Sequence, residues 1–132
     1  MNKHRSYNGK KINWLHYPTE INFFYLRLVT KESSVSVCFD IQHQSLEVRE
    51  VFFDQILELK KIMEQIINHP LLIEKDYNEQ NIQMLRLEWK YDHVFYKNSH
   101  DTEIIYDFFE KTLINFDKFY QEYKDLFIFL AK

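Results

Sequence analysis

Two carboxylates and a lysine near the middle of the chain have the order found in metal-dependent nucleases. Asp76 precedes Glu88-Trp89-Lys90, and in such enzymes the carboxylates bind Mg²⁺ while the lysine orients the attacking water. The same Glu-x-Lys pattern also occurs at Glu58-Leu59-Lys60, in a segment with helical periodicity. On a strand, Glu88 and Lys90 would lie on one face as solvated neighbours. We therefore expect no catalytic residue here.

The histidines and the single cysteine do not have the spacing of a metal site. The chain has six histidines, and no two of them lie four residues apart as on a metal-binding helix. One cysteine excludes an intramolecular disulfide and a cysteine-rich zinc site. Cys38 lies in an apolar pattern typical of a strand, which predicts a buried thiol. We expect neither a metal nor a cofactor.

Glycine is almost absent, and this excludes several common nucleotide-binding motifs. The chain of 132 residues contains one glycine, whereas average usage near 7% predicts roughly nine. Loops that cradle phosphates need several glycines, because backbone N–H groups must approach the phosphate closely. A glycine-flanked nucleophilic serine of the hydrolase type is excluded for the same reason.

A second constellation combines an arginine, a tyrosine and an aspartate. Alternation of apolar residues places Tyr25 and Arg27 on one face of a strand, and it places Asp40 on the same face of the next strand. A planar guanidinium beside an aromatic ring can bind a carboxylate or a phosphate. Arg27 and Asp40 can equally form a structural ion pair across the hairpin. The sequence leaves both interpretations open.

The charges are divided unevenly along the chain. Residues 1–19 carry four basic residues and no acidic one, a net charge of +4; residues 20–132 carry 13 basic and 20 acidic residues, a net charge of −7. We predict a basic N-terminal arm over residues 1–10, which can be a solvated chain end or can contact nucleic acid or an acidic surface of a second copy. The candidate contacts to nucleic acid are four basic residues for phosphates and two aromatic residues for base stacking: Lys3, Arg5, Lys10, Lys11, Trp14 and Tyr17.

The first half of the chain predicts three strands and a helix. Strands are expected over residues 11–17, 21–30 and 34–42, which together would form an antiparallel meander. Ser45 is a suitable N-cap for the following helix. Along that helix the apolar residues recur every three or four positions from Val48 to Ile66. Asn68-His69-Pro70 would end it, since proline cannot donate the next backbone hydrogen bond.

The second half predicts a hairpin and a longer helix. Residues 71–77 and 82–90 would pair around a turn near residues 78–81, and an optional short strand is expected over residues 94–97. Asp101 would cap the final helix. We therefore expect an α+β domain over residues 11–132, with an antiparallel sheet of about five to six strands and two long helices in the order βββ-α-ββ(β)-α.

The end of the final helix is apolar on every side, which predicts self-association. A helix with apolar residues all around cannot bury each side against one sheet, and large exposed apolar patches are typical of interfaces. The candidate residues for this contact are Tyr123, Phe127, Ile128, Phe129 and Leu130. Burial of the whole segment in the protein's own core is the alternative.

Three segments together resemble a known bacterial family. Residues 11–19 (KINWLHYPT), 52–61 (FFDQILELKK) and 116–120 (FDKFY) are similar to the domain-of-unknown-function family 4268, and the resemblance extends over residues 10–127. Members of that family usually have glycine where Glu20 stands. The resemblance implies no assigned activity. Some larger relatives carry this domain beside a nuclease-like domain, which implies an accessory role near DNA.

These observations predict a non-catalytic bacterial interaction module in the cytoplasm, acting through protein partners or as a homodimer. The alternative is an accessory nucleic-acid-binding module linked to a restriction or defence nuclease. A membrane protein is not expected, because the longest apolar run has six residues, from Leu126 to Ala131, and a spanning helix needs about 20.

Overall fold

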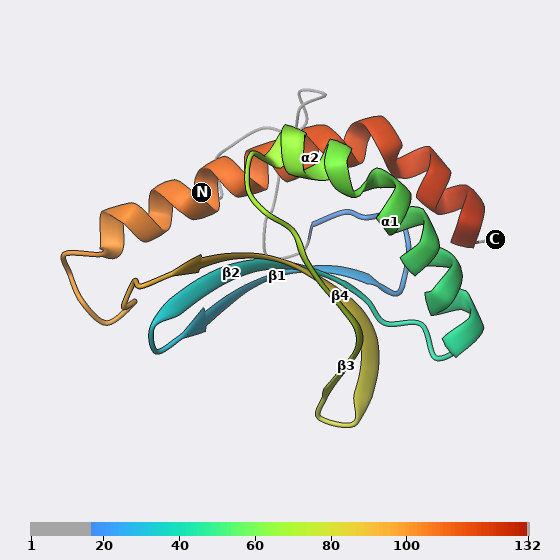
Figure 1. Ribbon diagram of the computed structural model, residues 1–132, viewed down its shortest axis with the longest axis horizontal. Helices are drawn as coiled ribbons and strands as arrows, with labels where there is room; N and C mark the ends of the chain where they lie inside the picture. The colour runs from blue at the N-terminus through green and yellow to red at the C-terminus, as the bar shows by residue number, and fades with distance from the viewer. Residues whose placement is uncertain (1–16, 132) are drawn as a thin grey trace.

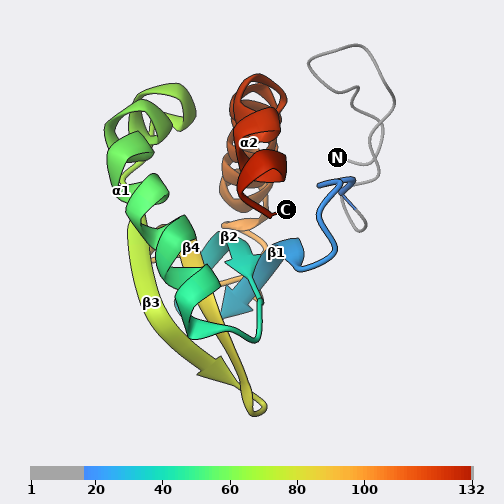
Figure 2. The ribbon, with the colours of Figure 1, turned by 90° about the vertical axis from the view of Figure 1, so that its right-hand side faces the viewer.

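Two hairpins form a single antiparallel sheet in the computed structural model, which describes residues 17–131. The first hairpin pairs β1 (Phe24–Lys31) with β2 (Ser34–Ile41), and the second pairs β3 (Leu72–Glu79) with β4 (Ile82–Asp92). The strand order is β1-β2-β4-β3, so that β2 and β4 are the central strands. The two helices are α1 (Leu46–Ile67) and α2 (Thr102–Ala131), and both cover the same face of the sheet (Figures 1 and 2).

Local chemistry explains both ends of α1 and the turn between β3 and β4. The hydroxyl of Ser45 accepts the N–H of Val48, as expected of an N-cap. Asn68 ends the helix in the left-handed conformation, with its N–H donated to the carbonyl of Glu64. Between β3 and β4, Gln80 and Asn81 have φ angles of 52° and 65°. Two successive positive φ angles are typical of the tight turns that match the twist of a hairpin.

The α+β class, the antiparallel sheet and the two helices are confirmed, but the number and order of strands were predicted wrongly. Within residues 17–131 the sheet has four strands, in the order ββ-α-ββ-α. Residues 11–16 of the first expected strand lie outside the described residues, and Tyr17 belongs to no strand. Residues 94–97 form no strand: residues 96 and 97 lie in a turn in which Asn98 donates its N–H to the carbonyl of Phe95, and His93 before them has a φ of 62°.

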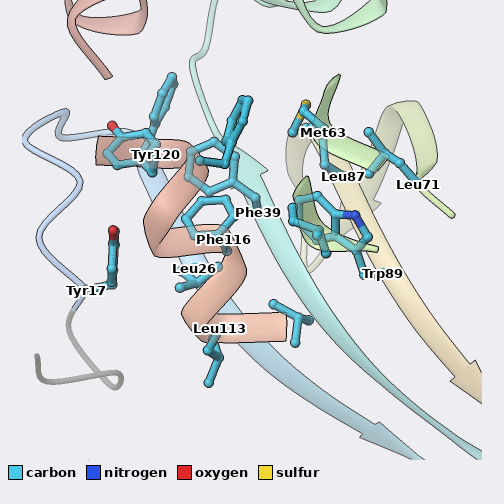
Figure 3. Packing of buried hydrophobic residues seen from close by; sticks show 14 of the residues in the cluster. Tyr17, Leu26, Phe39, Met63, Leu71, Leu87, Trp89, Leu113, Phe116 and Tyr120 are labelled. Carbon is cyan, nitrogen blue, oxygen red and sulfur yellow. The ribbon is translucent and has the colours of Figure 1, made fainter. Parts of the chain in front are cut away.

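Aromatic side chains fill the space between the sheet and the helices. Phe39 from β2 and Trp89 from β4 are fully buried and contact Phe116 from α2, with ring centroids 4.9 and 5.8 Å away. Figure 3 shows Tyr120 on the same side of α2 as Phe116, and the two rings are stacked. Each large side chain removed from water contributes about 1.5–3 kcal/mol, so this cluster fixes α2 against the centre of the sheet.

The segment before β1 is fixed to α2 by polar contacts. The hydroxyl of Tyr120 donates to the carbonyl of Thr19, and that of Tyr17 donates to Asp117. Glu20 has a φ of 67°, and its carboxylate pairs with Lys124 at 2.6 Å. Because this left-handed conformation favours glycine, the backbone explains why glycine would suit this position. None of the described helices is long and apolar enough to cross a membrane.

Candidate binding face of the sheet

The face of the sheet that points away from both helices, called the outer face below, carries the predicted arginine constellation. The pairing of Tyr25 with Asp40 and of Arg27 with Cys38 sets these side chains on one face, since successive residues alternate. Asp40 also pairs with Arg86 of β4. Figures 1 and 2 show the helices packed only against the opposite face. Neither α1 nor α2 covers the outer face, so side chains of the strands form its surface.

Asp40 is the centre of a buried ion network. Its side chain has no solvent exposure, and both of its oxygens are occupied. Arg86 binds it with two contacts of 2.8 Å, from Nε to Oδ1 and from Nη2 to Oδ2. Arg27 Nη1 lies 2.6 Å from Oδ2. Buried charges are normally paired in this way, and the contact with Asp40 raises the pKa of Arg86 above its ordinary value.

Each arginine of the network also stacks on a tyrosine. The guanidinium carbon of Arg27 lies 4.7 Å from the ring centre of Tyr25, and that of Arg86 lies 4.1 Å from the ring centre of Tyr77. Such cation–π contacts contribute about 0.5–2 kcal/mol. The rings restrict the guanidinium planes, so both arginines are held in fixed orientations.

The two arginines differ in their access to solvent. The side chain of Arg86 is 5% exposed, whereas that of Arg27 is 37% exposed. The Nη2 of Arg27 donates a hydrogen bond to Oε1 of Gln42, and Tyr25 beside it is 43% exposed. The structure thus contains the ion pair that the sequence allowed, and it also leaves Arg27 and Tyr25 partly available at the surface.

Sequence reasoning missed the part of this network that comes from outside the first hairpin. Arg86, Tyr77 and Gln42 were not singled out, nor was Glu79, whose carboxylate lies 3.5 Å from Arg86. Alternation along residues 82–90 places Arg86 on the same face as Glu88, which was visible in the sequence. The pairing of β4 with β2, which brings Arg86 to Asp40, depends on the strand order.

Two of the three residues considered for a nuclease site have other partners. Glu88 accepts a hydrogen bond from the hydroxyl of Ser36, and Lys90 pairs with Asp92 at 3.4 Å. Asp76 lies beside the register shift of β3. Among residues 17–131, no three histidine, cysteine or carboxylate side chains lie close enough together to hold a metal ion.

Cys38 is buried, as predicted, and lies on the outer face of β2. Its side chain has no solvent exposure. Burial raises the pKa of the thiol to about 12, which leaves almost no thiolate near neutral pH. Cys38 is therefore a packing residue in this face and a poor nucleophile.

Most candidate contacts to nucleic acid lie outside the described residues: Lys3, Arg5, Lys10, Lys11 and Trp14. Tyr17 is described, and its expected role in base stacking is not compatible with its position. The residue is 8% exposed, and its ring packs edge-on against Phe116 and Tyr120. Burial raises the pKa of its hydroxyl. A ring enclosed in this way cannot stack on a base.

The five residues proposed for self-association have very different exposures. Phe127 is fully buried, with its ring 5.9 Å from Phe24 and 6.4 Å from Phe52. Tyr123, Ile128 and Leu130 are partly buried against the core. Phe129 is 73% exposed. The apolar end of α2 is wider than one stripe because it packs against both α1 and β1.

The fold and this face define a two-layer α+β domain whose sheet is covered by helices on one side and carries a buried arginine–aspartate network on the other. The chain belongs to the family described as Domain of unknown function (DUF4268), whose model matches residues 1–124. No curated protein and no solved structure matches the chain significantly.

Proposed function

We propose that this protein is a non-catalytic interaction module that binds a protein partner on the outer face of its sheet. The observation that carries the proposal is the half-exposed pair of Arg27 and Tyr25, which lies on the face that the helices leave uncovered. Arginine and tyrosine are enriched among the residues that dominate binding energies. Asp40 and Gln42 hold Arg27 in place, so little side-chain entropy is lost on binding.

A second copy of the chain is the partner that the charge distribution favours. Residues 1–19 have a net charge of +4 and residues 20–132 one of −7, so the basic part of one copy attracts the acidic part of another. The outer face also presents Leu72 of β3, which is 50% exposed. In the proposed dimer, Leu72 provides an apolar contact and the guanidinium of Arg27 provides a polar one.

Site-specific photocrosslinking tests this proposal with purified protein. A benzoylphenylalanine replaces Tyr25 in one sample and Tyr106, which is 60% exposed on α2, in a control sample. We expect crosslinked dimers from position 25 that increase with protein concentration, and few from position 106. Adding Arg27→Ala to the first sample should reduce them. Sedimentation of the unmodified protein as a monomer at all concentrations, with no crosslink at position 25, would overturn the proposal.

A further inference from the structure

An open pocket lies between the start of α1 and the turn joining β3 to β4, and Gln42 is the one lining residue that also belongs to the site described above. Its volume is about 530 Å³. Apart from Ile82, the lining consists of amide side chains and one arginine: Gln42, Gln44, Asn78, Asn81, Gln83 and Arg49. A lining of this kind suits a hydrophilic ligand, because amides both donate and accept hydrogen bonds.

Arg49 is a buried cation without a counter-ion among residues 17–131. The residue is 3% exposed, and it forms an ion pair with none of the described residues. Its Nη1 donates to the carbonyls of His43 and Gln44 at 2.6 and 3.1 Å, and its Nη2 donates to Oε1 of Gln83 at 3.2 Å. All three acceptors are uncharged. Burying a charge without a counter-ion is costly.

Comparison with Arg86 shows which part of Arg49 lacks a partner. Arg86 is equally buried, at 4% exposure, and its Nε and Nη2 together bind the two carboxylate oxygens of Asp40. In Arg49 the Nε has no hydrogen-bond partner, and Nη2 has the amide of Gln83. A carboxylate therefore binds the Nε–Nη2 edge of Arg86, whereas at the same edge of Arg49 only Nη2 has a partner.

We propose that this pocket binds a hydrophilic organic anion whose carboxylate or phosphate oxygens occupy the Nε–Nη2 edge of Arg49. At this edge Nη2 contacts the side chain of Gln83, which is exposed and can turn away toward solvent. The pocket adjoins the first turn of α1, where the helix dipole also favours an anion. Its volume exceeds that of a single inorganic ion, so the lining amides contact the rest of the ligand. The pocket and the proposed interface share one residue, Gln42, which lines the pocket and accepts a hydrogen bond from Arg27; the experiments change Arg49 and Gln83, which belong to the pocket.

Calorimetric titration with four probes distinguishes the two sources of the anion. Inorganic phosphate and adenosine monophosphate represent phosphates, and N-acetylglutamate and citrate represent carboxylates. We expect saturable binding of one class and tighter binding of its organic member. Arg49→Lys, which keeps the charge but loses the planar edge, should weaken binding by roughly tenfold to a hundredfold.

Gln83→Glu provides a test that does not depend on disturbing the buried arginine. The new carboxylate would lie beside the unfilled edge of Arg49 and should act as an internal ligand, raising the melting temperature and abolishing probe binding. Gln65→Glu is the matched control, because it makes the same charge change at an exposed position of α1. Two results would overturn the proposal: failure of the folded wild type to bind any probe, and equal effects of the two glutamate variants.

Discussion

At the scale of single residues, Asp40 is the counter-ion of two arginines. Removing its charge leaves Arg86 buried without its bidentate counter-ion and Arg27 without its carboxylate partner. We expect Asp40→Asn to lower the free energy of unfolding by about 3–5 kcal/mol, the usual cost of breaking a buried ion pair on one side. Urea unfolding followed by circular dichroism measures this change.

Glu79 provides the control for Asp40, because it contacts the same arginine from the surface. Its side chain is 53% exposed, and its contact with Arg86 is 3.5 Å long. Exposed pairs of this kind contribute about 0–1 kcal/mol. A Glu79→Gln variant as unstable as Asp40→Asn would show that burial is not the reason for the effect.

At the scale of elements, Glu64 joins the end of α1 to the start of β3. Its carboxylate accepts the N–H of Leu71 at 2.8 Å and pairs with Lys60 at 3.2 Å. The hydrogen bond from Leu71 lowers the pKa of this carboxyl. A carboxyl with a lowered pKa stabilises the fold above its unfolded pKa, and this contribution is lost as the pH falls through the folded value.

Replacing Glu64 by glutamine should therefore give a pH-dependent effect. We expect Glu64→Gln to be less stable than the wild type at pH 7, with a difference that disappears at a pH below the range in which glutamate titrates. Urea unfolding at several pH values measures it. Glu58→Gln, an exposed change on the same helix, serves as the control, and a pH-independent difference for Glu64→Gln would contradict this explanation.

The end of α2 contains two phenylalanines with opposite environments. Phe127 is fully buried, and Phe129 is 73% exposed. Phe127→Ala should lower the free energy of unfolding by about 3–5 kcal/mol, as for other buried phenylalanines. Phe129→Ala should change it by no more than about 0.5 kcal/mol. Thermal unfolding measures both.

The same pair tests the self-association predicted for this end of α2. Sedimentation of the wild type and of Phe129→Ala measures the proposed dimerisation in both. A weaker dimer would assign the contact to the helix end, and an unchanged dimer would assign it to the outer face of the sheet.

At the scale of the whole molecule, the uneven charge makes a prediction for nucleic acid. Residues 1–19 have a net charge of +4, and the remaining residues 20–132 have a net charge of −7, which repels DNA. Any binding should therefore come from the basic arm and fall steeply between low and moderate salt. Fluorescence anisotropy with labelled single- and double-stranded DNA measures this, and deletion of residues 1–11 should abolish it. Absence of binding at low salt would remove the nucleic-acid hypothesis.

Local patterns in the sequence were sufficient for much of the fold. Serine before an apolar periodic segment predicted the start of α1, because its hydroxyl satisfies a free N–H group. Alternation predicted that Tyr25, Arg27 and Asp40 share a face, since the side-chain period of a strand is two. The expected strand over residues 94–97 failed because a positive φ at His93 ends the extended backbone, and apolar alternation does not report this.

By itself, the sequence determined the α+β class, both helices and the two hairpins, because these depend on periodicity and capping over a few residues. Tertiary structure decided what depends on contacts between distant segments. It brought Arg86 to Asp40 by placing β4 beside β2, it buried Tyr17 against α2, and among residues 17–131 it left the Nε of Arg49 without a partner. The cost of burying a charge or a ring depends on what packs around it, and residues far apart in the chain supply those surroundings.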